Sequence, residues 1–194
     1  PGRIARAGLS PADAALATEL TYGTLRMQGY YDRVIARAAG RPVDKIDPPL
    51  LDVLRLGAHQ LLSTRVPSHA AVNESVALAR QVGSRSGTGF VNGVLREVGR
   101  STPDEWRERV LADAKNEDER FAAISSHPAW IVRAFHRSLE AEGRGEELEA
   151  LLEADNTAPR VNLVALPGLA EPPSGARPDR FSPVGFTAGG GDPQ

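Results

Sequence analysis

Apolar residues recur every three or four positions through most of the first 157 residues, which is the period of an amphipathic helix. Proline, often beside serine or threonine, begins several of these stretches, and glycine ends others, as is typical of helix boundaries. The pattern predicts an all-α bundle over the first hundred residues, followed by further short helices. The expected helices cover about 11–27, 28–39, 48–61, 68–82, 90–100, 104–113, 117–125, 128–142 and 146–155.

The two central helices of this pattern, joined by a turn over 84–89, carry the most informative surface. The first begins at Pro67, whose φ is fixed, followed by Ser68, whose hydroxyl can cap free N–H groups. Two glycines inside the second helix cost roughly 1 kcal/mol each relative to alanine, so something is expected to approach the backbone closely. That object is either a neighbouring helix or a phosphate backbone. The polar face of the second helix carries Gly89, Asn92, Gly93, Arg96 and Arg100.

The pattern changes after residue 157. Residues 159–166 carry apolar residues in a β-rich order and predict one strand. The next stretch holds 6 Pro and 6 Gly in residues 166–194, too many for a core. We therefore expect a helical bundle over 1–101, a helical connector over 102–157, and over 158–194 the truncated, largely flexible start of an α/β domain. The glycine run 189–191 is interpreted as a flexible linker, because no helix follows it to hold a phosphate.

Charge is distributed unevenly along the chain. Residues 1–100 hold 13 Lys/Arg and 8 Asp/Glu, whereas residues 101–157 hold 7 and 14. The basic first half favours an anionic partner, and a solvated basic surface without a partner is the alternative. No apolar run reaches the roughly 18 residues of a membrane span, and no signal peptide opens the chain. We expect a soluble, cytoplasmic protein that does not contact a membrane.

Little in the sequence indicates catalysis. The chain has no cysteine, which excludes disulfides, thiolate metal ligands and cysteine nucleophiles. The four histidines, at positions 59, 69, 127 and 136, lack the helical spacing of a zinc site. His59 is expected on the polar face of its helix, beside Asp52 and Arg55. Core packing is the favoured role of the helical aromatic residues, which are Tyr22, Tyr30, Tyr31, Trp106, Trp130 and Phe135.

Three motifs in order carry a resemblance to a known family. They are LTYGTLR at 20–26, VPSHAAVNESV at 66–76 and FVNGVLR at 90–96. Together they resemble the NusB-type helical domain, and most closely its version at the N-terminus of the Sun/Fmu family of ribosomal RNA methyltransferases. HPAWIV at 127–132 and RVN at 160–162 extend the similarity towards the catalytic part of that family.

The resemblance implies a parent enzyme that transfers a methyl group from S-adenosylmethionine to carbon 5 of a cytosine in small-subunit ribosomal RNA. That reaction requires a cysteine nucleophile, which this chain lacks, and no cofactor loop is visible either. The fragment is therefore expected to be non-catalytic and to bind no cofactor, with S-adenosylmethionine implied for the full-length parent.

The resemblance further implies an RNA-binding or RNA-positioning role for the bundle, with ribosomal RNA as partner. The competing hypothesis is a protein-interaction module of the NusB type that docks a ribosomal protein or its own catalytic domain. A structural alternative for the motif residues is that the asparagines are buried amides and the glycines admit a neighbouring helix. Candidate phosphate contacts are Arg26, Arg65, Arg80, Arg85, Arg96 and Arg100. Candidate motif residues are Pro67, Asn73, Gly89, Asn92 and Gly93.

Overall fold

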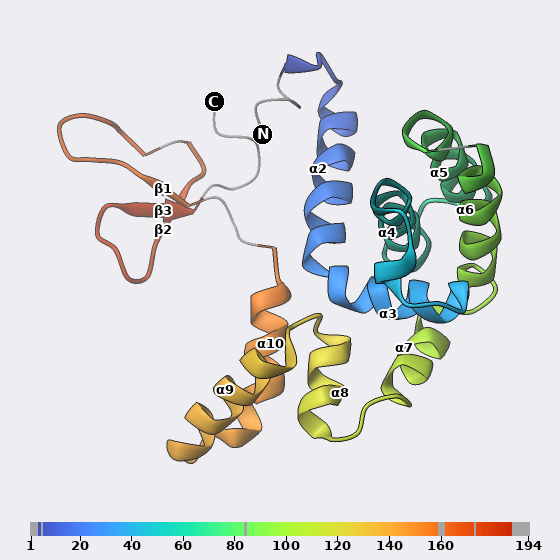
Figure 1. The fold of residues 1–194 in the computed structure, drawn as a ribbon. Helices are drawn as coiled ribbons and strands as arrows, with labels where there is room; N and C mark the ends of the chain where they lie inside the picture. The colour runs from blue at the N-terminus through green and yellow to red at the C-terminus, as the bar shows by residue number, and fades with distance from the viewer. Residues whose placement is uncertain (1–3, 5, 84, 159–161, 173, 188–194) are drawn as a thin grey trace. The chain divides into compact units, whose positions relative to one another are not determined.

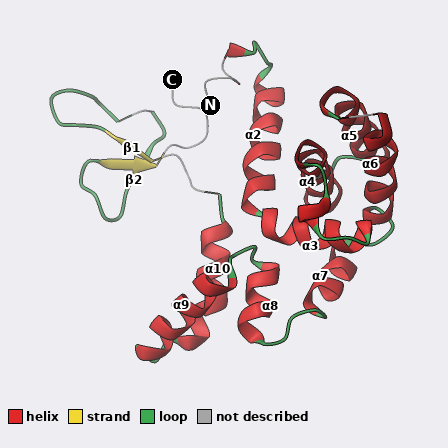
Figure 2. Ribbon diagram, viewed as in Figure 1, coloured by secondary structure: helices red, strands yellow, loops and turns green. Residues whose placement is uncertain are grey.

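The computed structural model describes residues 4, 6–83, 85–158, 162–172 and 174–187, except the side chains of Arg85 and Ser86. The chain divides into two compact units, Pro1–Glu153 and Ala154–Gln194. The first unit is helical, as the sequence predicted (Figure 1, Figure 2). Its helices are α2 (Pro11–Arg26), α3 (Gln28–Ala39), α4 (Pro48–Ser63), α5 (Ser68–Val82), α6 (Arg85–Val98), α7 (Pro103–Leu111), α8 (Glu117–Ile124) and α9 (Ala129–Ala141), with 3-10 turns at Val43–Lys45 and Gly145–Glu147. Helix α10 (Leu148–Asn156) begins in this unit and ends in the second.

Helix α4 lies at the centre of the bundle and contacts α2, α3, α5 and α6 (Figure 1). Two prolines begin it, in agreement with the preference of proline for the first helical turn. Its apolar stripe of Leu50, Val53, Leu54 and Ala58 is buried. Burying large apolar side chains such as Leu50, Val53 and Leu54, at roughly 1.5–3 kcal/mol each, makes α4 a large contributor to the stability of the bundle.

Helix α2 packs closely over α4 at Gly23, where an added Cβ would lie 2.5 Å from Cε1 of His59. His59 is only 2% exposed, and its Nδ1 lies 2.8 Å from the hydroxyl of Tyr31. The expectation of a polar-face histidine is therefore wrong, because the glycine lets α2 cover the ring. Burial lowers the pKa of His59, and burial also raises the pKa of Tyr31 to about 12. The nearest carboxylate is Glu19, whose Oε1 lies 3.4 Å from Nε2 of His59.

Helix α6 begins at Arg85, whereas the sequence predicted a turn over 84–89. Gly87 is buried in its first turn, and a Cβ there would lie 2.6 Å from Cδ1 of Leu50. Packing under Leu50 thus offsets the low helix propensity of glycine, a tertiary effect that local pattern does not contain. Helix α5 ends at Gly83 as predicted.

The connector helices are joined to the bundle by specific polar contacts. Trp106 of α7 is buried and its indole N–H donates to the carbonyl of Val98 at 2.8 Å. Ser126, between α8 and α9, has a left-handed backbone with φ 61°. Its Oγ accepts the N–H of Gly29 at 2.7 Å and that of Tyr30 at 3.3 Å. A serine 97 residues away in sequence therefore caps α3, which has no side-chain cap of its own.

Two aromatic residues differ from the core role that the sequence favoured. Tyr31 and Trp106 are buried, but Tyr22 is 46% exposed and Trp130 is 65% exposed. Helical spacing alone cannot tell which face of a helix a neighbour covers, and no described residue covers these two side chains fully. The other expected core aromatics, Tyr30 and Phe135, are half-buried.

The second unit contains a small antiparallel sheet of order β1-β3-β2, where the sequence predicted only one strand. Val164 of the first strand pairs with Gly185, and Pro178 pairs with Phe186. Pro178 lies on an edge strand, where its missing N–H removes no ladder hydrogen bond from the interior of the sheet. The extra strands are too short to give a period. The strands are β1 (Asn162–Val164), β2 (Arg177–Pro178) and β3 (Gly185–Thr187).

The glycine run 189–191 and residues 159–161 lie outside the described residues, so the interpretation of that run stays a prediction, as does the expected flexibility of 158–194. Within the described ranges, no helix is both long and apolar enough to cross a membrane.

Candidate functional site

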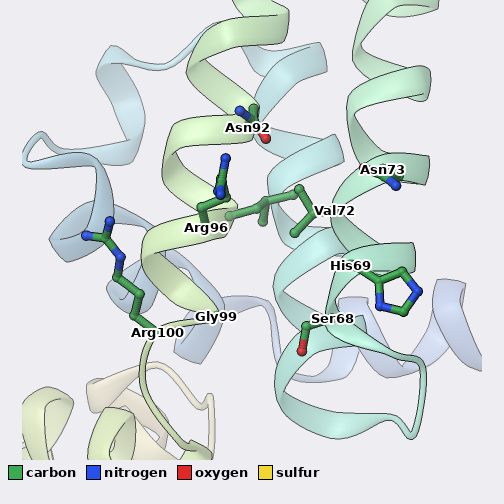
Figure 3. A pocket seen from close by; sticks show the side chains of 9 residues that line it. Ser68, His69, Val72, Asn73, Asn92, Arg96, Gly99 and Arg100 are labelled. Carbon is green, nitrogen blue, oxygen red and sulfur yellow. The ribbon is translucent and has the colours of Figure 1, made fainter.

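The candidate site is a groove of about 490 Å³ between α5 and α6, which we call the α5–α6 groove (Figure 3). Side chains from the start of α5 and the end of α6 form it, and both helices carry motifs that the sequence singled out. The groove is lined by Ser68, His69, Val72, Asn73, Asn92, Leu95, Arg96, Gly99 and Arg100.

The apolar floor of the groove consists of Val72 and Leu95. The side chain of Val72 lies between the two helices in Figure 3. Leu95 is buried because it packs on the backbone of Gly57 in α4, where an added Cβ would lie 2.5 Å from its Cδ1. Buried Ser75 of α5 also lies against this glycine. The small residue in α4 thus lets α5 and α6 both pack closely on α4 and holds the floor in place.

Polar side chains form the two sides of the groove. From α6 come half-buried Asn92 and exposed Arg96, whose side chain runs back along the helix towards Asn92 (Figure 3). From α5 come exposed His69 and Asn73, on the other side of the floor (Figure 3). One side therefore offers a cation and an amide, and the other offers an imidazole and an amide.

The cationic groups of the groove differ in their availability. Arg100 is exposed and donates to Glu97 at 2.7 Å. Such an exposed pair contributes at most about 1 kcal/mol, so a stronger anion can replace Glu97. Arg96 forms no ion pair with any side chain in the described part of the chain. Its guanidinium can therefore contact an external anion without breaking a native salt bridge.

The start of α5 differs from the prediction in one detail. Pro67 occupies the cap position, and no side-chain cap hydrogen bond is made at this helix start. Ser68 is instead the first residue of the helix and lines the groove. The uncapped first turn adds partial positive charge at this end of the groove.

Among the described residues, no neighbouring helix explains the glycines on the open face of α6. A Cβ added at Gly89 or Gly93 would have no atom of the described chain within 4 Å. Asn73 is exposed and Asn92 is half-buried, so they are not the buried amides of the structural alternative. That alternative is wrong, and the face is free to be approached by something outside the described residues.

Comparison with known proteins decides the family, because residues 3–100 match the NusB family. The chain belongs to the NusB family. The resemblance seen in the three motifs is thereby confirmed, and the closely packed bundle around α4 is a NusB-family domain.

The relatives of this NusB-family chain are named as methyltransferases. It is 43% identical over 199 residues to the "Putative methyltransferase" of Mycobacterium tuberculosis (strain H37Rv). That alignment covers 100% of the chain and 43% of the relative. It is 30% identical over 155 residues to the ribosomal RNA small subunit methyltransferase B of Escherichia coli O157:H7, and 31% identical to that of Enterobacter sp. (strain 638). These alignments cover 80% of the chain and 33% of each relative, so the chain spans less than half of their length.

The NusB-family bundle brings together only some of the predicted site residues. Asn73, Asn92, Arg96 and Arg100 share the α5–α6 groove. Others lie apart: Arg26 is half-buried at the end of α2, Arg65 precedes α5, and Arg80 lies near the opposite end of α5. The side chain of Arg85 lies outside the described part.

On the α5 side of the groove the sequence had indicated Asn73, but not Ser68, His69 or Val72 as site residues. His69 and Asn73 are four residues apart, as are Asn92 and Arg96, and each pair therefore lies on one helix face. The sequence shows both spacings, but whether the two pairs of side chains face each other across a groove depends on how the two helices pack. Within the described part of this NusB-family chain, no group of three or more His, Asp or Glu side chains could hold a metal ion.

Proposed function

We propose that this chain is the RNA-binding and RNA-positioning part of an S-adenosylmethionine-dependent methyltransferase that modifies carbon 5 of a cytosine in small-subunit ribosomal RNA. In this proposal the chain itself is non-catalytic, residues 1–101 bind RNA, 102–157 connect to the catalytic part, and the protein acts in the cytoplasm. The names of the relatives support the reaction class. The α5–α6 groove is the observation that carries the RNA role.

The groove has the chemistry of a phosphate contact. Arg96 lies in the last turn of α6 and Arg100 two residues beyond its end, and Ser68 at the uncapped start of α5 lines the same groove. Arginine offers several N–H donors in a planar fork that matches phosphate oxygens. Contacts to phosphate fix the position of an RNA without reading its sequence, which is the role expected of a positioning domain.

The test is the salt dependence of RNA binding by the 194-residue chain. Arg96→Ala with Arg100→Ala should weaken binding to a small-subunit ribosomal RNA hairpin and flatten the slope of log affinity against log salt by nearly one unit per lost contact. The matched control is Arg133→Ala with Arg137→Ala. These two exposed arginines have the same four-residue spacing on α9 and lie outside the groove. The control should leave the slope unchanged if the groove is the contact.

The alternative function is docking of a ribosomal protein or of the parent's own catalytic domain. Leu25 at 60% and Trp130 at 65% are large apolar side chains exposed on α2 and α9, and they are the observation that favours it. Unchanged RNA affinity and slope in the groove variant would move the preference to docking.

The proposal also assigns the cofactor to the part of the parent outside this chain. Isothermal calorimetry with S-adenosylmethionine is the direct measurement, and no heat of binding is expected. A micromolar dissociation constant would contradict the assignment.

A further inference from the structure

We propose that the α5–α6 groove seats a single unpaired nucleotide of an RNA strand, with the base on the apolar floor and its phosphodiester at Arg96 and Arg100. The inference rests on the proposed function and deepens it. It changes the expected ligand from any phosphate backbone to a strand that can turn one base outward.

The size of the groove favours one nucleotide over a duplex surface. A volume of about 490 Å³ falls within the roughly 300–1,000 Å³ of small-ligand sites. A duplex keeps its bases stacked inside and offers only phosphates and sugars to a recess of this kind. It would contact the rim arginines and leave the floor in water, whereas an unpaired base can be splayed out into the recess.

The floor and sides have the groups that a base requires. Of the two floor residues Leu95 is fully buried, and half-buried Val72 supplies the apolar surface for the face of a base. Asn73 and Asn92, on opposite sides, each carry an amide donor and an amide acceptor for base edges. The exposed imidazole of His69 is an aromatic group on which a base can stack.

The arginines complete the arrangement at the α6 end. Arg96 is next to Asn92 along the helix, and Arg100 follows one turn later beside Gly99 (Figure 3). A base held between the asparagines thus has its own phosphate within reach of the same helix. Neither a lone basic patch nor a lone apolar patch would have this order of groups.

The experiment compares one labelled RNA in two forms by fluorescence anisotropy. The probe is an unstructured ten-nucleotide strand, and the second form is the same strand annealed to its complement. The single strand should bind about tenfold more tightly than the duplex, the factor expected when one base gains a stacking and packing site. His69→Ala and Asn92→Leu should each reduce that ratio several-fold, and His69→Phe should preserve it because the aromatic face remains.

The matched control is Gln81→Leu, which exchanges an exposed amide on α5 outside the groove and should leave the ratio unchanged. Circular dichroism melting of each variant verifies that the bundle is folded, and leucine or alanine suits a helix interior.

The outcomes separate this inference from the function on which it rests. Equal binding of strand and duplex, with a salt slope that still responds to Arg96 and Arg100, would overturn the nucleotide seat and leave the RNA role standing. A strand preference that survives both His69→Ala and Asn92→Leu would also overturn it. Absence of binding to either form at low salt would overturn both proposals.

Discussion

Two pairs of glycines inside helices have opposite surroundings in this molecule. At Gly23 and Gly57 an added Cβ would lie 2.5 Å from a side-chain atom of His59 and of Leu95, respectively. At Gly89 and Gly93 it would meet no atom of the described chain within 4 Å. The first pair is required by the packing of α2, α4 and α6, and the second pair is not required by any packing that the structure describes.

The difference shows that a helical glycine alone does not tell core packing from a binding face. Both pairs lower the intrinsic stability of their helices by roughly 1 kcal/mol per residue. For the packed pair, close contact between helices offsets that cost. For the open pair, no packing contact within the described chain offsets that cost. Gly89 and Gly93 share the polar face of α6 with Arg96, which makes this face the place where an outside partner can approach.

The largest expected effect is at Gly57. Gly57→Leu should lower the free energy of unfolding by about 3 kcal/mol or prevent folding, because Leu95 and Ser75 occupy the space beside its backbone. Urea denaturation followed by circular dichroism measures the change. A variant as stable as the parent would show that α5 and α6 can move away from α4. Gly57 would then not be required by packing, contrary to the comparison above.

The next effect is at Gly23. Gly23→Ala should destabilise the bundle by about 2 kcal/mol, because the new methyl group would displace the buried ring of His59. Thermal melting gives the change, with Gly93→Ala as the matched glycine-to-alanine exchange. If alanine at position 23 stabilised the chain, helix propensity would outweigh the packing that we describe.

The close packing of α2 on α4 also predicts that the free energy of unfolding depends on pH through His59. Its folded pKa lies below the unfolded value, so the unfolded chain binds a proton first as the pH falls below about 6.5. Stability is therefore full above that pH and decreases on acidification towards the folded pKa, by at most about 1.4 kcal/mol per pH unit for one proton. His59→Gln should remove this slope in urea unfolding at pH 7.5 and 5.5.

His136 is the matched control for that measurement. A hydrogen bond to Asp118 at 2.7 Å raises the pKa of His136. The stability that His136 contributes is therefore present at low pH and is lost as the pH rises through the folded pKa. His136→Gln should therefore make the loss of stability on acidification steeper. An identical pH slope in both variants would contradict the assignment of the acid sensitivity to His59.

The smallest effect is expected on the open face. Gly93→Ala should raise the free energy of unfolding by about 0.5–1 kcal/mol, since helix propensity improves and no neighbour is displaced. The melting temperature reports it directly. A loss of stability instead would mean that some part of the chain outside the described residues covers this face.

Helix positions could be predicted from the sequence because their signals are local. Ser10 caps α2 by accepting the N–H of Asp13, and Thr102 with Glu105 forms a capping box at α7. The start of α6 and the burial of His59 could not be predicted from the sequence, since each depends on a residue from a distant helix. Leu50 covers Gly87, and Gly23 admits the histidine ring.

The site was predictable to the same extent. Spacing along α6 placed Asn92, Arg96 and Arg100 on one face, and the structure brings them into one groove. The contribution of His69 required knowing how α5 pairs with α6. No local signal contains that packing, because Ser75 of α5 and Leu95 of α6 both pack against Gly57 of a third helix.

The cap that Ser126 provides for α3 has a consequence for the order of synthesis. The N–H of Gly29 is made 97 residues before the serine oxygen that accepts it. At roughly 5–20 residues per second, about 5–20 s separate the two on a translating ribosome. During that interval the first turn of α3 has no side-chain cap, and this helix gains its cap only when Ser126 has been made. A truncation after residue 101 would leave that turn frayed permanently.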